Sequence, residues 1–449
     1  MVSLARLRLC GCLLAVTTAA ACSADAGVQG SQDRPARPGP VRAHIGEPRS
    51  SPERPPGAPL CAGLRTKPPA AAESAWGRMI DAAAGPHEVG VAAGADDRIL
   101  FAHGAGRVRT PASNQKLLVS MALLDHLGPD HRIPTRAAAT RVNGSTVTGD
   151  LWLIGRGDPT LTERAPGYWG GVRATTIEEL AAGVAGAGIT EVRGRIMGER
   201  GYFDDDLTAP GWQPYVPGRY VQLPSALVLA GNNSGDARPE RAAAAALTRE
   251  LRRLGVQVTG MPGAGESPQG LTAVAAVRSR PLSEIVGYMN RTSNNFFAEM
   301  LGKRLGAESF GPPGTIAKGA RAIERWARRH GVHLEANDAS GLSYANRISP
   351  RGLIRLLGAA EAAGWGKHLR AGLPGPAEGT LRGRLRGLEV RAKTGTLFNG
   401  ASALSGWVRS TASNGWVAFS IIGRGTPKAV EDRIVGIISR ARIPAVPKC

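Results

Sequence analysis

The spacing of apolar residues predicts a helix, a hairpin and then a buried helix at the start of the folded chain. A helix is expected over residues 74–84, and two short apolar runs joined by Ala-Asp-Asp within 88–103 are typical of a β-hairpin. The next helix is predicted from about Ser113 to Leu127, and a Gly-Pro pair ends it. Apolar residues cover much of its circumference. We therefore expect this helix to lie in the centre of a domain.

The last third of the chain predicts further helices followed by three strands. The strand-like runs are LEVRAKTGTL, SALSGWVRS and WVAFSIIGRG, and the hairpin at 88–103 needs such partners because two strands alone are rarely stable. We therefore predict an α+β fold in which one antiparallel five-stranded sheet, with helices on both sides, is assembled from both ends of the chain. The helices are expected at 282–289, 295–305, 316–330 and 429–441.

Residues 135–270 differ from the rest of the chain in composition and pattern, with many glycines, short strand-like segments and an Ala-rich helix near 240–253. This predicts an inserted mixed domain, or two, that interrupts a main domain formed by residues 61–134 and 271–449.

The first 60 residues predict export. Residues 1–22 have early arginines, a short apolar run and then small residues, the layout of a cleaved secretory signal. Cys22 follows three alanines and is either a lipid acceptor or a residue near an ordinary cleavage site. Residues 23–60 are rich in proline and poor in apolar residues, which is typical of a disordered tether. The expected location is the outer face of the cytoplasmic membrane or a periplasm-like space.

Two cysteines remain after the signal and the tether, Cys61 and Cys449, one opening the main domain and one ending the chain. In an oxidising compartment such a pair predicts a disulfide that ties the two ends together. The net charge of +20 predicts an anionic partner. Because the arginines are scattered and aromatics make up only 5% of the residues, we favour the anionic cell envelope over nucleic acid.

Lysine is rare in this chain, since only eight of the 56 basic residues are lysines. A buried lysine can lose its proton whereas arginine stays charged, so Lys116 is a candidate base. Ser113 lies three residues earlier, on the same face of the predicted buried helix, where the two side chains can touch. A hydroxyl becomes a good nucleophile when a neighbouring base removes its proton.

Two other stretches carry candidate chemistry. Ser293 and Asn295 form Ser-x-Asn at a helix entrance, and Lys393 begins Lys-Thr-Gly-Thr on a predicted strand. Each is weak alone, and Ser293 by itself is most simply a helix cap. However, no other lysine follows a serine by three residues or precedes Thr-Gly, and the three motifs occur in the order Ser-x-x-Lys, Ser-x-Asn, Lys-Thr-Gly.

This set of motifs is the signature of β-lactamases and penicillin-binding proteins. Over residues 70–445 the chain resembles the low-molecular-mass class C penicillin-binding proteins, the D-Ala-D-Ala carboxypeptidase/endopeptidase family. The similar blocks include GRGDPTLT, RGYFDDD, RPLSEIVGYMNRTSNNFFAEML, LPGPAEGTLRGRL and RAKTGTLFNGASALSGWV. DASGLS departs from the usual Asp-Gly-Ser-Gly but keeps Ser340-Gly341.

The resemblance implies a serine D-Ala-D-Ala carboxypeptidase or endopeptidase that acts on peptidoglycan stem peptides and is acylated by β-lactams. Ser113 would be the nucleophile and Lys116 its base, while Ser293 would relay a proton to the leaving D-alanine. Asn295 would hold the substrate amide. The terminal carboxylate would bind Lys393 and the hydroxyls of Thr394 and Thr396, and the N–H groups of Ser113 and Thr396 would form the oxyanion hole. No metal or other cofactor is needed.

Service as a base at pH 7 requires the Lys116 pKa to fall by about 3 units from its usual value. Burial and a second cation produce such shifts, and we expect Lys393 to be that cation.

Three alternatives stay open at this point. A β-lactamase would share the catalytic plan, but its first two motifs normally lie closer than the 180 positions between Ser113 and Ser293. A non-catalytic wall-binding protein would not need the intact motifs. Asp204, Asp205 and Asp206 could hold a metal, although consecutive carboxylates more often form a solvated turn. Glu299 is expected to be structural, paired with Lys303 one turn along the helix.

Overall fold

The computed structural model describes residues 75–95, 98–164, 168–169 and 171–442 of the chain. The predicted signal at 1–22 with Cys22, the tether at 23–60 and the Cys61–Cys449 disulfide therefore lie outside the described residues. In the part that is described, no helix has both the length and the apolar character needed to cross a lipid bilayer.

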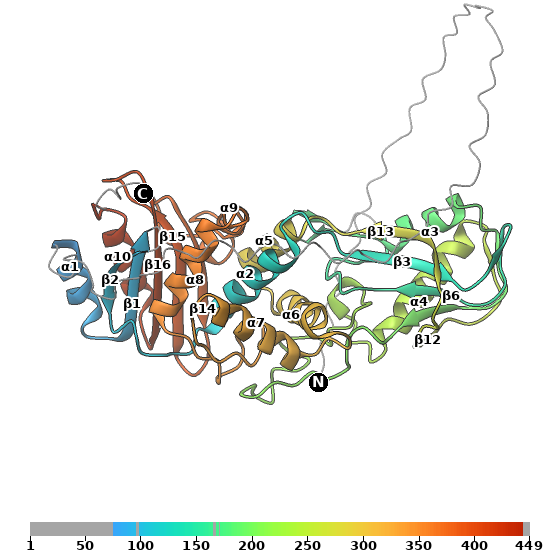
Figure 1. The fold of residues 1–449 in the computed structure, drawn as a ribbon, viewed down its shortest axis with the longest axis horizontal. Coiled ribbons are helices and arrows are strands. Elements are labelled where there is room, and N and C mark those ends of the chain that lie inside the picture. Colours follow the sequence, from blue (N-terminus) through green and yellow to red (C-terminus); the bar gives the residue numbers. More distant parts are fainter. Residues whose placement is uncertain (1–74, 96–97, 165–167, 170, 443–449) are drawn as a thin grey trace, which may run out of the picture. The chain divides into compact units, whose positions relative to one another are not determined.

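A five-stranded antiparallel sheet joins the two ends of the chain. Its strand order is β14-β15-β16-β1-β2, and Figure 1 shows the blue strands β1 and β2 in one sheet with the red and orange strands from the C-terminal part. The register pairs Val91 with Ile421 and Thr394 with Leu404. The strands are β1 (Glu88–Ala95), β2 (Arg98–His103), β14 (Val390–Thr396), β15 (Ala401–Arg409) and β16 (Trp416–Arg424).

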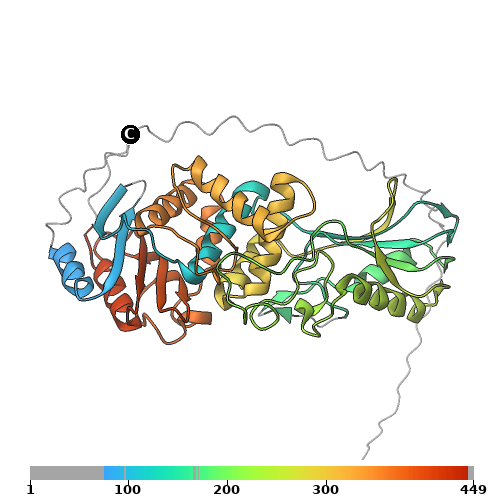
Figure 2. The same ribbon diagram turned by 90° about the horizontal axis from the view of Figure 1, so that it is seen from below.

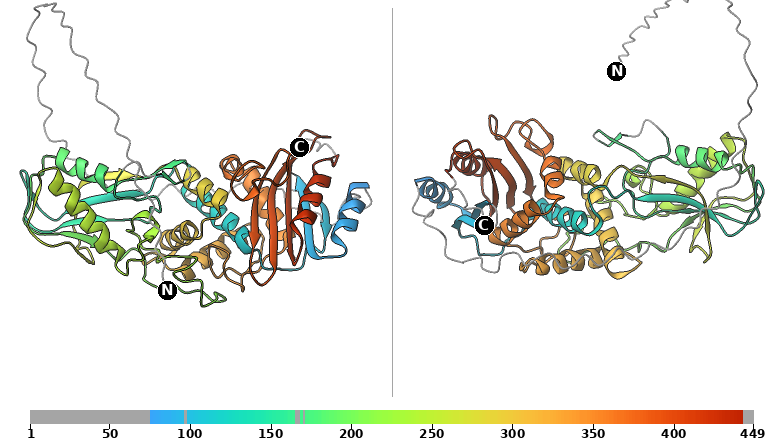
Figure 3. Two further views of the ribbon diagram at one scale, coloured as in Figure 1. Left: turned by 180° about the vertical axis from the view of Figure 1, so that it is seen from behind. Right: turned by 45° about the horizontal axis from the view of Figure 1, so that its top comes forward.

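Helices cover both faces of this sheet because side chains alternate between its faces and are apolar on both. On β16, Phe419 and Ile421 belong to the buried cluster that includes α1 (Ala75–Ala84) and α10 (Lys428–Ile438). Figure 3 shows the red helix α10 lying across the sheet. Ile422 belongs to the cluster on the other face, where α8 (Pro350–Ala362) packs on β1 and β16.

The predicted central helix is α2 (Gln115–Leu127), which one 3₁₀ turn, η2 (Ala112–Asn114), precedes. Every residue from Gln115 to Leu124 is buried, as expected for a helix that is apolar nearly all round. Figure 2 shows α2, in cyan, among the yellow and orange helices. Its contacts are with α5 (Leu282–Thr292), α6 (Asn295–Phe310), α7 (Ile316–Arg329) and the short α9 (Gly366–Gly372).

The insertion has its own sheets and its own core. Its largest sheet is mixed and five-stranded, in the order β12-β10-β6-β3-β13, and helices α3 (Ile177–Gly186) and α4 (Pro239–Arg253) pack against each other beside it. The strands of this sheet are β3 (Pro134–Ala139), β6 (Leu151–Ile154), β10 (Ile196–Glu199), β12 (Gly263–Gly265) and β13 (Thr272–Arg278). Together with the first sheet, this confirms the predicted α+β fold with an inserted mixed domain, but the insertion extends past its expected end at residue 270 because β13 pairs with β3.

Short strands complete the insertion. A four-stranded sheet has the order β11-β9-β5-β4, and β7 pairs with β8. These strands are β4 (Val142–Asn143), β5 (Thr146–Val147), β7 (Tyr168–Trp169), β8 (Val172–Arg173), β9 (Glu191–Val192) and β11 (Gln257–Val258).

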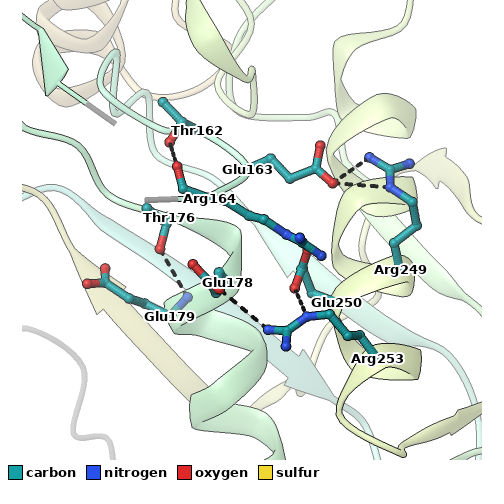
Figure 4. Close-up of polar contacts among 9 residues, drawn as sticks. All are labelled: Thr162, Glu163, Arg164, Thr176, Glu178, Glu179, Arg249, Glu250 and Arg253. Atoms are coloured by element: carbon teal, nitrogen blue, oxygen red, sulfur yellow. Dashed lines mark hydrogen bonds and ion pairs between the residues drawn. The ribbon is translucent and has the colours of Figure 1, made fainter. Parts of the chain in front are cut away.

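An ion-pair network ties α3 and α4 to the segment that precedes α3 (Figure 4). The Glu250 carboxylate is fully buried and accepts hydrogen bonds from Arg164 and Arg253. Arg253 also lies 3.4 Å from Glu178 at the start of α3. Because a buried carboxylate without partners would cost several kcal/mol, these arginines are what allow Glu250 to lie inside the insertion.

Candidate active site

Ser113 lies in the 3₁₀ turn that leads into α2, and polar contacts hold this turn from two sides. Asn114 donates from Nδ2 to the Ser405 hydroxyl on β15 at 2.8 Å, and Gln115 donates from Nε2 to the Asp338 carbonyl at 3.0 Å. Ala112, just before the serine, has φ +47°, a left-handed conformation that non-glycine residues seldom adopt. The turn thus holds a partly exposed hydroxyl at the entrance of a buried helix.

Lys116 is fully buried one turn further along, and its ammonium nitrogen makes three polar contacts. Nζ lies 3.2 Å from the Ser113 hydroxyl, 2.8 Å from Asn295 Oδ1 and 2.5 Å from the Ser340 carbonyl. The structure therefore brings together Ser113, Lys116 and Asn295, as the motifs predict.

These three partners match the neutral amine as well as the ammonium. The Asn295 and Ser340 oxygens can only accept hydrogen bonds, so they take two N–H groups of Lys116. In the neutral amine the remaining position is a lone pair that faces the Ser113 hydroxyl. The hydroxyl can donate its proton to this lone pair.

Burial lowers the pKa of Lys116 from 10.5 to about 8. The carboxylates of Asp338 and Glu299 act in the opposite direction and keep the pKa from falling further. Lys393 is the second buried cation beside Lys116, and its pKa lies well below 10.5, first because of burial and second because of the charge on Lys116.

The two carboxylates behind Lys116 were missed by sequence reasoning as parts of the site. Glu299 accepts the backbone N–H groups of Ala339 and Ser340, at 3.2 and 2.8 Å, and so fixes the carbonyl that contacts Lys116. Burial, followed by the charge on Asp338, raises the pKa of Glu299 to about 7. The signal that could have identified Glu299 is its position on α6, one turn after Asn295 and on the same face.

The expected pairing of Glu299 with Lys303 is wrong. Lys303 is fully buried and pairs with Asp204 at 2.8 Å, and it also donates to the backbone carbonyls of Asp204 and Asp206. Part of the three-aspartate segment is thus bound to a lysine of α6. Among the described residues, no group of three or more His, Cys, Asp or Glu side chains is placed to hold a metal ion.

Ser293 and Lys393 meet on the other side of the site. Lys393 is fully buried and donates from Nζ to the Ser293 hydroxyl at 2.9 Å and to the Thr394 carbonyl at 2.8 Å. Among the described residues the partners of Lys393 Nζ are thus a hydroxyl and a carbonyl, and none is a carboxylate. An anion that enters the site would therefore favour the protonated form of Lys393.

Ser293 is not the N-cap of the following helix. Asn294 caps α6, accepting the Phe297 N–H on its side chain at 2.9 Å. Ser293 ends α5 instead, with φ +56° in the left-handed region. Backbone strain of this kind is costly and concentrates at functional sites, which favours a functional interpretation over simple capping.

Strand β14 is an edge strand whose backbone passes against the turn that carries Ser113. A Cβ atom on Gly395 would lie 3.0 Å from both the Ser113 nitrogen and the Pro111 carbonyl, so only glycine fits without displacement. Gly341 packs against the same turn. A Cβ atom on Gly341 would lie 2.0 Å from the Ala112 carbonyl oxygen, and the φ of Gly341 is +84°. Glycine at these two positions therefore allows the Lys-Thr-Gly strand and the Ser340-Gly341 turn to approach the turn that carries Ser113.

The direction of the β14 amides can be read from their neighbours. The Leu397 N–H bonds inward to the Ala401 carbonyl, and the Ala392 N–H bonds outward to the Pro374 carbonyl. Since successive amides point to opposite sides of a strand, the Thr396 N–H points to the open edge of β14. The Thr394 hydroxyl donates to Thr380 Oγ1 at 2.8 Å, whereas Thr396 is exposed.

Thr380 was not predicted to take part, although it lies in the quoted block LPGPAEGTLRGRL. It belongs to the short helix η4 (Gly379–Leu381), which packs against α5 and β14. Nothing in its local sequence indicates this position.

Beside Ser293 and Asn295 lies a cavity of about 300 Å³. The insertion contributes part of its wall, with Arg219, Tyr220 and Gln222. The insertion therefore helps to shape the space that a ligand of this site would occupy.

Comparison with known proteins gives a family match over most of the chain. The model of the D-Ala-D-Ala carboxypeptidase 3 (S13) family matches residues 81–235 and 233–441. The chain is 32% identical over 432 residues to a D-alanyl-D-alanine carboxypeptidase of Actinomadura sp. (strain R39), which covers 75% of this chain and 78% of the relative. It is 28% identical over 334 residues to a carboxypeptidase of Mycobacterium tuberculosis, covering 70% of this chain and 67% of that relative.

Solved structures share the fold. Penicillin binding protein 4 of Haemophilus influenzae superposes with a TM-score of 0.66 at 19% identity, covering 80% of this chain and 97% of that one. The same protein in complex with a β-lactam gives a TM-score of 0.63 at 18% identity, with 79% and 97% covered.

Proposed function

Since this chain belongs to the D-Ala-D-Ala carboxypeptidase 3 (S13) family of serine-type D-Ala-D-Ala carboxypeptidases, we propose that it cleaves peptidoglycan stem peptides through an acyl-enzyme on Ser113. The observation that carries this proposal is the contact of the buried Lys116 amine with the Ser113 hydroxyl, at 3.2 Å. The other two partners of that amine accept its N–H groups and leave the lone pair for the serine.

Acylation begins when Lys116 takes the Ser113 proton and Oγ attacks the carbonyl carbon of the penultimate D-alanine. A C–O bond forms while the carbonyl oxygen becomes an oxyanion. The N–H groups of Ser113 and Thr396 stabilise this charge, and the outward direction of the Thr396 N–H supports that role. One donor of this kind typically contributes about 3–4 kcal/mol to transition-state stabilisation.

The C–N bond then breaks as Ser293 passes its hydroxyl proton to the departing amine of D-alanine and recovers a proton from the protonated Lys116. Lys393 supports this step because it lies 2.9 Å from the Ser293 hydroxyl. Water later gives a proton to Lys116 and attacks the ester carbonyl, the bond to Oγ breaks as Ser113 recovers a proton from Lys116, and the shortened stem peptide leaves with a free carboxylate.

Lys393 binds the terminal carboxylate of the substrate, together with the hydroxyls of Thr394 and Thr396. Its burial without a carboxylate partner among the described residues supports this role, because the substrate would supply the missing charge. Asn295 holds the substrate amide through its Nδ2, since its Oδ1 already accepts from Lys116.

β-Lactams should acylate the same serine, because their strained amide presents a carbonyl and a carboxylate in a similar arrangement. The β-lactam complex of the Haemophilus protein supports this part of the proposal. The enzyme would act in the cell envelope, exported by residues 1–22, with its net charge of +20 favouring the anionic surface.

Labelling with a fluorescent penicillin tests the proposal against its alternatives. We expect wild-type protein to carry a stable label and Ser113→Ala to carry none. Rapid loss of the label from the wild type would favour a β-lactamase, and no label on the wild type would favour a non-catalytic wall-binding protein.

The balance between carboxypeptidase and endopeptidase activity depends on how the insertion shapes the cleft. The insertion residues that line the cavity beside Ser293 support a role for it in this choice. Incubation with a pentapeptide and with cross-linked muropeptides, followed by mass spectrometry of the products, separates the two activities.

A further inference from the structure

The short helix η4 and the glutamate before it are attached to two elements at once. Arg391 of β14 donates from Nη1 to both carboxylate oxygens of Glu378, at 3.1 and 3.0 Å. Gly379, with φ +45°, lies against the last turn of α5, where a Cβ atom would come 2.0 Å from the Arg291 carbonyl oxygen. Leu381 is fully buried in a cluster that also includes side chains of β14. The helix η4 is therefore fixed on both α5 and β14.

The elements α5 and β14 are the ones that bring Ser293 and Lys393 together. Arg291 precedes Ser293 by two residues, and Arg391 precedes Lys393 by two residues. The helix η4 contacts both elements beside the 2.9 Å hydrogen bond between Lys393 Nζ and the Ser293 hydroxyl. A side chain of η4 therefore has a fixed position relative to both motifs.

Thr380 is the residue of η4 that contacts the Lys-Thr-Gly motif. Its Oγ1 accepts a hydrogen bond from Thr394 Oγ1 at 2.8 Å, and both threonines are half-buried. Among the described residues, this is the one hydrogen bond of either hydroxyl. Because a hydroxyl has one proton and two lone pairs, the Thr380 proton is not taken by an acceptor in this part of the chain.

Binding of the substrate changes which atom donates in this pair. A carboxylate without a proton only accepts hydrogen bonds, so Thr394 has to turn its single proton from Thr380 toward the terminal carboxylate. The Thr394 oxygen then faces Thr380 with a lone pair, and the Thr380 proton forms the replacement bond. The two bonds run in one direction, from Thr380 to Thr394 to the carboxylate, and each polarises and strengthens the other.

We propose that Thr380 is a positioning residue for the terminal carboxylate of the substrate. Its hydroxyl donates to Thr394 Oγ1 in the complex and holds the Thr394 side chain in the rotamer that directs its proton at the carboxylate. Thr380 itself does not touch the substrate. This role rests on the proposed function, in which Thr394 binds that carboxylate.

Two thioester substrates with the same acyl part test this role. Their thiol leaving group carries a carboxylate in one and a methyl group, which cannot accept a hydrogen bond, in the other. A thiolate leaves without a proton from Ser293, so turnover of the methyl form stays measurable. We expect the wild type to prefer the acid form in kcat/KM.

Thr380→Val replaces the hydroxyl with a methyl group of similar size and should reduce the preference for the acid form. We expect a reduction of about three- to tenfold, because Thr394 gains access to three staggered rotamers and its bond to the carboxylate is no longer polarised. Turnover of the methyl form should not change. If Thr380→Val does not fold, Thr380→Ala, which is smaller, replaces it in the test.

Two further variants separate the hydroxyl from the packing of the side chain. Thr380→Ser keeps the hydroxyl and should keep the wild-type preference. Thr411→Val is the matched control, since Thr411 is exposed after the end of β15 and its hydroxyl donates to the Ser439 carbonyl at 3.2 Å. In a background of Thr394→Val, the change Thr380→Val should have no further effect on the preference, because the two hydroxyls act as one unit.

Each protein is also titrated with fluorescent penicillin, which counts the active serines. The proposal is overturned if Thr380→Val slows both thioesters by the same factor, if it leaves the preference unchanged, or if Thr380→Ser is as impaired as Thr380→Val. Any of these results with a wild type that is labelled removes the role of Thr380 alone. A wild type that takes no label removes the proposed function, and this role with it. A labelled wild type that uses both thioesters alike removes the carboxylate contact and the role of Thr380 together.

Discussion

Lys116 and Lys303 are both fully buried, but their partners differ. Lys303 lies 2.8 Å from the Asp204 carboxylate, so its charge is compensated by a direct ion pair. Lys116 contacts a hydroxyl, an amide oxygen and a backbone carbonyl, and the carboxylates near it are not bonded to it. Both lysines bind backbone carbonyls, so the contrast lies in the carboxylate.

The difference shows how the same residue type serves two purposes. The ion pair of Lys303 with Asp204 joins two elements, α6 and the insertion. Lys116 has no such ion pair, and burial lowers its pKa to about 8. Burial alone therefore does not identify a base, and the partner atoms must be known.

The largest effect is expected for Lys116→Arg. Arginine keeps its proton at every accessible pH and cannot take one from Ser113. We expect the rate of acylation by fluorescent penicillin to fall by about 10²- to 10⁴-fold, the range typical of a lost general base. The melting temperature of the variant, measured in parallel, shows whether its acylation rate falls because the protein unfolds. An acylation rate equal to that of the wild type would remove Lys116 from the mechanism.

Lys303→Met should act on stability rather than on chemistry. It leaves the Asp204 carboxylate without its partner, and because that carboxylate is about one quarter exposed we expect a loss of about 2–3 kcal/mol in the free energy of unfolding. Urea denaturation measures this, with Lys367→Met, an exposed lysine, as the matched control. If Lys303→Met abolished acylation while its unfolding curve stayed unchanged, the proposed contrast would be wrong.

A smaller effect is expected for Glu299→Gln. The Glu299 charge raises the pKa of Lys116, so its removal should move the rise of acylation rate with pH to lower pH. Glutamine can still accept both backbone N–H groups, because both contact the same carboxylate oxygen. The pH profile of the variant beside that of the wild type measures the shift, and a shift to higher pH would contradict this assignment.

The fold was predictable where periodicity is strong. The hairpin at 88–103, the apolar run of α2 and the three late strands appear where the apolar pattern places them. The helices α3, α8 and α9 were not predicted, and α9 has only seven residues, too few to show a clear period.

The residues of the site that belong to the three motifs were predictable from the sequence, and the other residues of the site were not. Ser113, Lys116, Ser293, Asn295 and Lys393 were named because their spacing is distinctive, and the structure brings them within hydrogen-bond distance of one another in two groups. Glu299 and Thr380 come from segments that only tertiary packing brings to the site. The pairing of Lys303 with Asp204, 99 positions away, has no local signal in the sequence.

The most direct test of the central claim is the rate of penicillin acylation of the wild-type protein between pH 6 and pH 10. If the Lys116 amine is the base, the rate rises as the amine loses its proton, with a midpoint near its pKa of about 8, and levels off above it. A rate that stays constant across this range, or that rises only near the usual lysine pKa of about 10.4, would contradict the account.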